Sequence, residues 1–182
     1  MPGATSMTTA EAIYEAGRRL FLRDGYATTT VRAIAAEAGI NPALVIRHYG
    51  SKEALFLATM TPTNGFTPIL EGPLESLGEA LVEFVINTAG TPGSDTFQAL
   101  IMAADRPDVR ERILSASREF FEQGLAERLS GDDRELRARL VSAQVSGLML
   151  SYWVLKDPVL TRSDRRRMVA LAGRALQRLI TP

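Results

Sequence analysis

The 182-residue chain has few of the side chains that catalyse reactions or bind metals. It contains no Cys and one His, His48. The lack of Cys excludes disulfides, thiolate zinc sites, iron–sulfur clusters and cysteine nucleophiles, and a single His excludes multi-histidine metal sites. We find no phosphate-binding loop or activated nucleophile, and the paired carboxylates fall on helix faces that we expect to be solvated. The sequence therefore favours a binding protein without metal or cofactor over an enzyme.

Helical periodicity runs through the chain, and strand signals are almost absent. A capping box, Thr8-x-x-Glu11, begins a first helix that Gly25 is expected to end. Residues 61–73 are rich in Pro, Gly and Thr and are the predicted domain boundary. Five further helices are predicted at residues 74–89, 94–104, 108–129, 134–156 and 163–180. We therefore expect an all-α protein, with a small head over residues 1–60 and a larger helical bundle over residues 61–182.

Two short helices of the head, over residues of about 30–49, are joined by a three-residue turn. Thr30 caps the first helix, Gly39 tolerates a positive φ in the turn, and Asn41 followed by Pro42 begins the second. This is the layout of a helix-turn-helix. The residues expected to pack beneath these two helices are Ile34, Ala35, Ile40 and Val45.

The segment 30–55, TVRAIAAEAGINPALVIRHYGSKEAL, resembles the DNA-binding segment of the TetR family of bacterial transcriptional regulators. The matching features are Thr30, Ile34-Ala35, Ala38-Gly39, the helix start at Asn41, the His48-aromatic pair and Ser51-Lys52-Glu53. Three residues depart from the family pattern. Ile46 replaces a Tyr that usually donates its hydroxyl to a phosphate, Ala43 replaces a frequent Gly, and Tyr49 replaces a Phe.

The resemblance implies a helix-turn-helix DNA-binding domain over residues 1–60. The remaining residues, 61–182, would form a domain that binds ligand and dimerises. A member of this family would be a homodimeric repressor that an unknown small apolar ligand releases from its double-stranded DNA operator.

The start of a recognition helix meets base edges in the major groove of DNA. If Val45 faces the core, then Pro42, Ala43, Leu44 and Arg47 face outward. Arg47 is the best candidate for a guanine contact, and Leu44 could meet a thymine methyl. For Arg47 the alternative is an exposed side chain that makes no specific contact.

Contacts to phosphate position the head without reading sequence. For the three threonines simple helix capping is an equal alternative, for His48 a structural hydrogen bond, and for Lys52 a solvated ammonium. We expect Lys52 to clamp a phosphate because a cation in the first turn of a helix is unfavourable unless an anion neutralises it. The predicted phosphate-contacting residues are Thr28, Thr29, Thr30, Arg32, His48, Tyr49 and Lys52.

The last two predicted helices are the expected dimer interface. Ala143, Gly147 and Ser151 form a stripe of small residues, spaced four apart, that lets another helix approach closely. The alternative is that both helices complete the core of one subunit. The predicted interface residues are Ala143, Gly147, Leu148, Ser151, Val154, Ala172, Ala175, Leu176 and Leu179.

The resemblance also implies a small-molecule pocket between the middle helices. Methionine and aromatic residues at helical spacing usually belong to the core, so only part of the candidate set is expected to line a pocket. The candidates are Phe66, Phe84, Phe97, Met102, Phe120, Phe121, Met149, Tyr152 and Trp153, with Asn87, Gln98 and Gln144 as polar anchors.

The net charge of zero is unevenly distributed along the chain. Residues 1–60 carry 6 Lys+Arg and 5 Asp+Glu, residues 61–105 carry 0 and 6, and residues 106–182 carry 15 and 10. The head is therefore weakly basic, which predicts few ionic phosphate contacts and a modest dependence of DNA binding on salt.

The first residues, MPGATSMTTAEA, lack a basic stretch followed by an apolar one, and the longest apolar run is too short to span a bilayer. We therefore expect a cytoplasmic protein without a membrane partner. The leading hypothesis is a ligand-responsive DNA-binding regulator. The first alternative is a helical protein-interaction module that no longer binds DNA, and the second is an enzyme.

Overall fold

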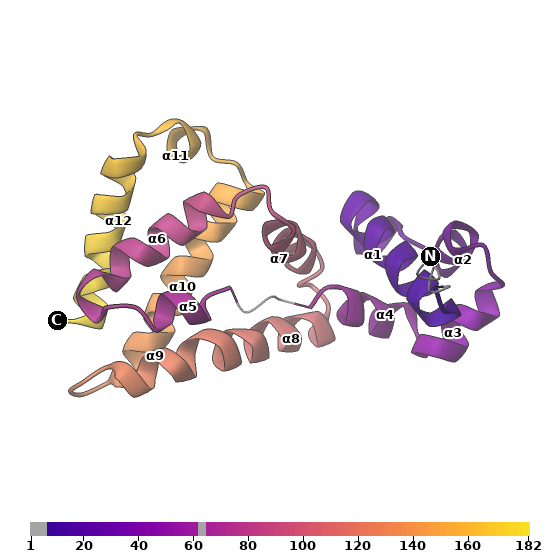
Figure 1. Ribbon diagram of the computed structural model, residues 1–182, viewed down its shortest axis with the longest axis horizontal. Helices are drawn as coiled ribbons and strands as arrows, with labels where there is room; N and C mark the ends of the chain where they lie inside the picture. Colours follow the sequence, from indigo (N-terminus) through magenta and orange to yellow (C-terminus); the bar gives the residue numbers. More distant parts are fainter. Residues whose placement is uncertain (1–6, 62–64) are drawn as a thin grey trace, which may run out of the picture. The chain divides into compact units, whose positions relative to one another are not determined.

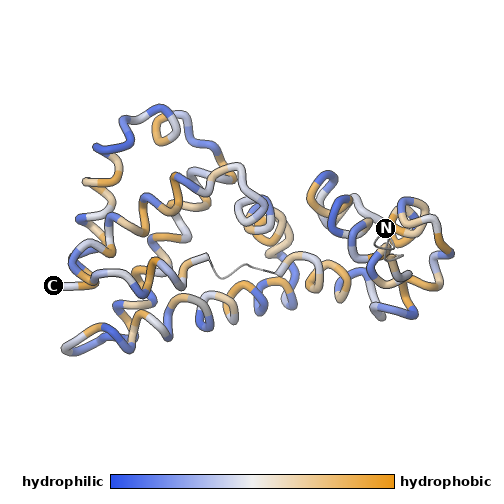
Figure 2. Tube along the Cα trace, viewed as in Figure 1, coloured by the Kyte–Doolittle hydropathy of each residue, from blue (hydrophilic) through white to orange (hydrophobic). Residues whose placement is uncertain are grey.

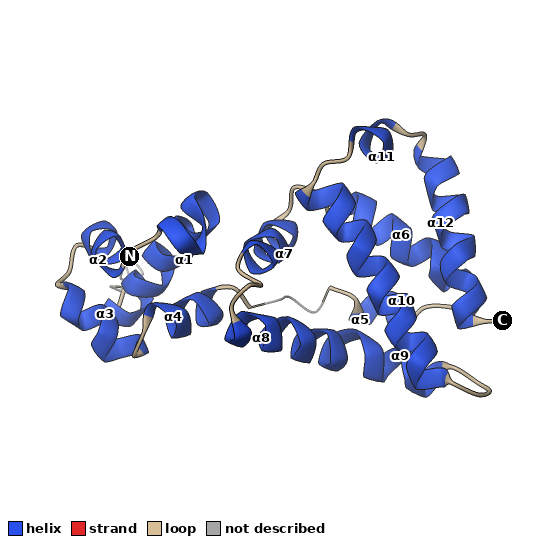
Figure 3. Cartoon of the chain, turned by 180° about the vertical axis from the view of Figure 1, so that it is seen from behind, coloured by secondary structure: helices blue, strands red, loops and turns tan. Residues whose placement is uncertain are grey.

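The computed structural model describes residues 7–61 and 65–182, except for the side chain of Phe120. In these residues every regular element is a helix and no strand is present, which confirms the predicted fold class (Figure 3). No helix of the described part is long and apolar enough to cross a membrane.

The chain divides into two compact units. One unit contains the described residues up to Thr61 together with Ala99–Arg110, and the other contains the described residues of Pro62–Gln98 and Glu111–Pro182. The sequence placed the boundary near residue 60 but did not indicate that Ala99–Arg110 packs with the head.

The head is built from four helices, α1 (Thr9–Thr28), α2 (Val31–Ala38), α3 (Pro42–Tyr49) and α4 (Lys52–Thr59) (Figure 1). Each begins at a side chain that accepts a hydrogen bond from a free backbone N–H of the first turn. The Thr8 and Glu11 pair forms the predicted capping box of α1. The caps of α2, α3 and α4 are Thr30, Asn41 and Ser51.

Two glycines set the direction of the chain in the head. Gly25 has φ 79°, so the helical path of α1 breaks where the sequence predicted its end, although three more residues follow in α1. Gly39 adopts the left-handed conformation between α2 and α3, as the predicted turn requires. The core beneath α2 and α3 contains Ile34, Ala35 and Val45, each at most 1% exposed, as predicted, whereas Ile40, predicted with them, is only half-buried.

The second unit is a helical bundle with a continuous apolar core. Two of the predicted helices, those at residues 108–129 and 134–156, are each confirmed as one helical path that includes a π-helical turn. The first path is α8 (Pro107–Ser117), η2 (Arg118–Glu122) and α9 (Gln123–Arg128), of which Pro107–Arg110 belongs to the head unit. The second is α10 (Arg134–Met149) and η3 (Leu150–Val154). The other elements are α5 (Thr67–Leu70), η1 (Leu74–Ser76), α6 (Leu77–Asn87), α11 (Pro158–Arg162), α12 (Arg165–Ile180) and α7 (Pro92–Met102), of which Ala99–Met102 belongs to the head unit.

Helices α6 and α12 lie side by side and make the closest helix pair of this bundle (Figure 1). Hydrophobic stretches recur between hydrophilic ones along α12 (Figure 2), as in an amphipathic helix, where apolar residues return every three to four positions. A Cβ on Gly78 would lie 2.3 Å from the carbonyl oxygen of Gly173, so two glycines allow the two backbones to touch. The amide of Gln177 joins them further, because it accepts from the Gly78 N–H at 2.9 Å and donates to the Leu74 carbonyl at 2.8 Å.

Candidate nucleic-acid interface

The outward face of α3 carries the residues that could read DNA. Val45 is fully buried, whereas Pro42, Ala43 and Arg47 are exposed, as the sequence predicted, and His48 is exposed as well. Leu44, the predicted reader of a thymine methyl, is half-buried, but Ile46 is 45% exposed.

Arg47 is the strongest candidate for a base contact on this face. In the described part of the chain its guanidinium takes part in no ion pair. An exposed guanidinium without a carboxylate partner keeps all five N–H donors available to an external acceptor. The side chain of Arg47 is therefore free to bind a guanine edge.

The start of α2 combines two exposed hydroxyls with a helix N-terminus. Thr28 and Thr30 are exposed, and the hydroxyl oxygen of Thr30 accepts from the Ala33 N–H at 3.1 Å, which leaves its proton free to donate. Arg32 is exposed in the first turn. The partial positive charge of the helix N-terminus also favours an anion at this position.

Thr29 does not belong to this set. Its side chain is 2% exposed, and its hydroxyl donates to the carbonyl of Gly25 at 2.8 Å. A hydroxyl buried in this way cannot reach a phosphate, so the prediction of a phosphate contact by the Thr29 side chain is wrong. Instead, the hydrogen bond of the Thr29 hydroxyl to Gly25 stabilises the chain at the break in α1.

Lys52 has partners that the sequence did not reveal. Its ammonium donates to the carbonyls of Tyr26 and Thr29, both at 2.9 Å, and lies 4.0 Å from the centre of the Tyr26 ring. Partial burial lowers the pKa of the Lys52 ammonium. The unfavourable cation at the start of α4 is thus neutralised by carbonyls of the same chain, and one N–H donor remains for the predicted phosphate contact.

The hydroxyl of Tyr49 is also occupied within the head. It donates to the Ala10 carbonyl at 3.0 Å, and burial raises its pKa. A phenolic proton used in this bond is not available to a phosphate, so the prediction that the Tyr49 hydroxyl contacts a phosphate is wrong. Tyr49 ties the end of α3 to α1.

A second charged cluster joins α1 and α4 to the segment Ala99–Arg110. The hydroxyl of Tyr26 donates to the carboxylate of Glu53, and Nη2 of Arg106 donates to the same carboxylate at 3.1 Å. The Arg106 guanidinium carbon lies 4.6 Å from the centre of the Tyr26 ring, so two cations, Arg106 and Lys52, share one aromatic ring. Nothing in the sequence pattern pairs Glu53 with an arginine 53 residues away.

These contacts shift two pKa values. The pKa of the Glu53 carboxyl lies below its ordinary value of 4.5, chiefly because the Tyr26 hydroxyl donates to its charged form. Burial, together with the bond to Glu53, raises the pKa of the Tyr26 hydroxyl. Both shifts indicate that the folded head holds Glu53 charged and Tyr26 neutral.

Because the pKa of Glu53 is lower in the folded head than in the unfolded chain, its contribution to stability is present above pH 4.5 and is lost as the pH falls. We expect the Tyr26→Phe substitution to lower the free energy of unfolding by about 1 kcal/mol at neutral pH, a value that allows for the solvent exposure of the carboxylate. Between about pH 5 and 3, the variant should then lose less stability than the unchanged chain. Urea unfolding at a series of pH values measures this difference.

Tyr14→Phe is the matched control, since no hydrogen bond to the Tyr14 hydroxyl is present among the described residues. Its stability should follow that of the unchanged chain at every pH. Parallel curves for the Tyr26→Phe variant and the unchanged chain would contradict the role of this hydrogen bond.

In the second unit, the aromatic residues predicted to line a ligand pocket lie close together, whereas the predicted polar anchors do not. The Phe66 ring lies 4.5 Å from that of Phe84 and 5.1 Å from that of Phe121, and the Phe97 ring lies 5.5 Å from that of Trp153. Met149 is buried and Tyr152 is half-buried against the same core. The side chain of Phe120 lies outside the described residues.

Four candidates are misplaced for a shared pocket. Asn87, Gln98 and Gln144 are exposed on three different helices, and Met102 is 71% exposed and belongs to the head unit. These residues do not line the aromatic cluster, so their assignment to its pocket is corrected. Helical periodicity alone could not tell which face each of them occupies.

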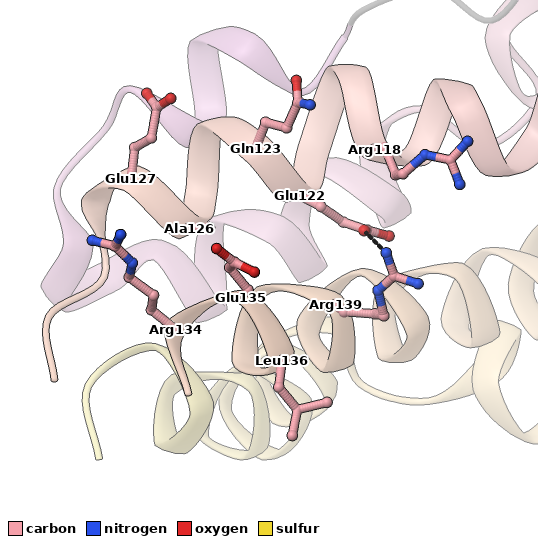
Figure 4. A pocket seen from close by; sticks show the side chains of 9 residues that line it. All are labelled: Arg118, Glu122, Gln123, Ala126, Glu127, Arg134, Glu135, Leu136 and Arg139. Atoms are coloured by element: carbon pink, nitrogen blue, oxygen red, sulfur yellow. Dashed lines mark ion pairs between the residues drawn. The ribbon is translucent and has the colours of Figure 1, made fainter. Parts of the chain in front are cut away.

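A groove of about 830 Å³ lies between η2, α9 and the start of α10 (Figure 4). Its lining is largely charged, and Nη2 of Arg139 pairs with the Glu122 carboxylate at 3.0 Å. None of the predicted ligand-binding residues lines it. The lining residues are Arg118, Glu122, Gln123, Ala126, Glu127, Arg134, Glu135, Leu136 and Arg139.

The residues predicted to form the dimer interface differ in how far they are exposed to solvent. Leu176 is 3% exposed and belongs to the core of its own subunit, so its assignment to the interface is wrong. Leu148, Ser151, Val154, Ala172 and Leu179 are half-buried, and Ala143, Gly147 and Ala175 are exposed. The same helices also expose Leu136, Leu140 and Leu171, which the sequence analysis did not single out.

Comparison with known families finds matches over both parts of the chain. Residues 13–59 match the family described as "Bacterial regulatory proteins, tetR family". Residues 75–180 match "Tetracyclin repressor-like, C-terminal domain".

An HTH-type transcriptional repressor of Mycobacterium tuberculosis is 30% identical over 131 residues, which are 66% of this chain and 65% of that protein. The chain thus matches slightly less than two thirds of the length of this curated relative. A TetR-family regulator from Streptomyces coelicolor has a similar structure, with a TM-score of 0.63, 28% identity and coverage of 100% of this chain and 99% of that one. NalD of Pseudomonas aeruginosa, the secondary repressor of the MexAB-OprM multidrug efflux pump, shares the fold with a TM-score of 0.69, at 22% identity over 93% of this chain and 94% of its own.

Proposed function

This chain belongs to the TetR family of bacterial regulatory proteins, and we propose that it acts in the cytoplasm as a homodimeric repressor that binds operator DNA. A small apolar ligand would release it from the operator. The observation that carries the proposal is the free guanidinium of Arg47 on the exposed face of α3. Its helix begins at the Asn41 cap and follows a glycine in the left-handed conformation, which is the geometry of a recognition helix.

The head offers separate groups for bases and for phosphates. α3 enters the major groove, where Arg47 donates two hydrogen bonds to O6 and N7 of guanine. Thr28, Thr30 and Arg32 at the start of α2 hold a phosphate, and His48 near the end of α3 holds another. Since few of these groups are cationic, the salt dependence of binding should be modest.

Two features support a homodimer: the way in which a helix-turn-helix head binds DNA, and the exposed apolar residues on the second unit. One recognition helix reads one half-site, and paired half-sites about one helical turn apart need two copies. Leu136, Leu140 and Leu171 are 55%, 42% and 55% exposed on α10 and α12, two helices that pack against each other, and exposed apolar residues of this kind favour an interaction surface. On the same helix as Leu136 and Leu140, Gly147 has open space where a Cβ would be, so a second copy of α10 can approach there.

The aromatic cluster of the second unit is the proposed ligand site. Phe66, Phe84, Phe97 and Tyr152 are only half-buried, so their rings are accessible to an apolar molecule. Phe121 lies in the π-helical turn η2, and Tyr152 and Trp153 lie in η3. π-helical turns are rare in proteins, and those that do occur often lie at functional sites. The ligand must bind one of two conformations of the protein more tightly in order to shift the equilibrium between them.

Selection of genomic DNA fragments by the purified protein, followed by shift assays at several salt concentrations, tests this function. We expect specific fragments to be retained, with an affinity that falls as salt rises. The Gly147→Arg variant should sediment as a monomer and bind these fragments at least about a hundredfold more weakly, because it loses the second half-site.

Gly124→Arg is the matched control, because Gly124 is also a helical glycine with open space at its Cβ position but lies on α9, which is not one of the two helices of the proposed interface. It should remain dimeric and bind like the unchanged protein. If no fragment is retained at any salt concentration, the chain is instead a helical interaction module. A monomeric unchanged protein would exclude the homodimer.

A further inference from the structure

Ile46 is an exposed hydrophobic residue in the middle of the proposed DNA-reading helix. It is 45% exposed, and no other large hydrophobic residue of helices α1 to α4, all of which are described, is exposed to this degree. Ile46 lies three positions and Arg47 four positions after Ala43, so both side chains neighbour Ala43 on the helix surface. The exposed face of α3 thus carries an apolar group beside the guanidinium.

The side chain of Ile46 has no hydrogen-bond donor, so it cannot hold a phosphate as a tyrosine at this position would. Its chemistry instead matches one feature of the major groove. Among the four bases, only thymine presents an apolar group there, the C5-methyl. Leu44 could make the same contact by its chemistry, but it is half-buried and less free to do so.

We propose that Ile46, together with Ala43, reads thymine methyl groups in the operator. This inference rests on the proposed function, since it requires α3 to lie in the major groove. A turn of α-helix rises 5.4 Å, and successive bases rise 3.4 Å, so side chains of one turn reach the same or adjacent base pairs. Each half-site therefore contains a thymine within about two base pairs of the guanine that Arg47 contacts.

The test uses the DNA fragments selected by the unchanged protein, prepared once with thymidine and once with deoxyuridine throughout. Deoxyuridine lacks only the C5-methyl and keeps every hydrogen-bonding group. Burial of one methyl corresponds to about a fourfold gain in affinity, so the two copies of Ile46 should favour the thymidine duplex by about fifteenfold. The selected fragments should also share a thymine beside the guanine in each half-site.

The Ile46→Ala variant should bind the thymidine duplex more weakly and lose most of this preference. Because Ile46 is exposed and alanine favours helices, the variant should fold, which its thermal unfolding checks. Arg32→Ala is the control. It should weaken binding to both duplexes by the same factor and keep the fifteenfold ratio, because a phosphate contact carries no base information.

Equal binding of both duplexes by the unchanged protein would overturn the role of Ile46 while leaving the proposed function intact. An undiminished thymidine preference in the Ile46→Ala variant would also overturn it and assign the methyl contact to another residue. Absence of binding to either duplex would overturn both proposals together.

Discussion

Replacing Arg47 with alanine is expected to weaken operator binding by at least about thirtyfold. A bidentate pair between arginine and guanine contributes about 1–3 kcal/mol of discrimination, and a homodimer makes two such pairs. No other described basic side chain lies on the exposed face of α3 to take over the contact, since His48 offers a single imidazole near the helix end. Shift assays on the selected fragments, at one fixed salt concentration, measure the loss.

The loss should be specific to sequence as well as large. Without the guanidinium, the variant should no longer distinguish the contacted guanine from other bases, and its residual binding should resemble binding to unrelated DNA. Arg47→Lys should recover little, because an ammonium cannot donate the two parallel hydrogen bonds that guanine accepts.

Arg23→Ala is the control for the removal of one positive charge from the head. Arg23 is exposed near the end of α1 and pairs with the neighbouring Asp24 at 2.8 Å, so it has no role in base reading. Its replacement should change affinity by less than about threefold. If the Arg47→Ala variant bound as tightly and as selectively as this control, Arg47 would not be the base-reading residue.

Replacing Gly78 with alanine is expected to destabilise the second unit by about 3 kcal/mol. The new Cβ would lie 2.3 Å from the carbonyl oxygen of Gly173 and 2.9 Å from the backbone nitrogen of Gln177. Neither backbone atom can move without separating α6 from α12. Overpacking costs about 1–3 kcal/mol, and loss of the hydrogen bond from the Gly78 N–H to Gln177 adds about 1 kcal/mol.

Replacing Gly124 with alanine should have the opposite effect on stability. Gly124 lies in α9 with open space around a Cβ, so alanine there should raise the free energy of unfolding by up to about 1 kcal/mol through its helix propensity. Thermal and urea unfolding of the two variants compare them directly. A Gly78→Ala variant as stable as the unchanged chain would mean that α6 and α12 do not cross at these glycines.

The residues of the helix-turn-helix could be predicted because their signals are local. Thr30, Asn41 and Ser51 each satisfy a free N–H of the helix that follows, and Gly39 adopts a conformation that its lack of a Cβ permits. These preferences depend on residues a few positions apart. Periodicity also identified the buried positions Ile34 and Val45 correctly.

The partners of polar side chains could not be predicted in this way. The sequence assigned Lys52 to a phosphate, but the structure gives its ammonium two carbonyls that lie 26 and 23 residues away. It assigned Thr29 to the same surface, but the break at Gly25 turns that side chain inward. An unfavourable charge or a free hydroxyl shows that a partner is needed, but it does not identify the partner.

The sequence by itself determined the all-α class, the four helices of the head and the outward position of Arg47. These features follow from backbone preferences and from hydrophobic spacing within single helices. Only the tertiary structure decided that Glu53 pairs with Arg106, that Gly78 meets Gly173 and that Leu176 belongs to the core of its own subunit. Such contacts join residues tens of positions apart, so they depend on how whole helices pack against one another, which no local pattern encodes.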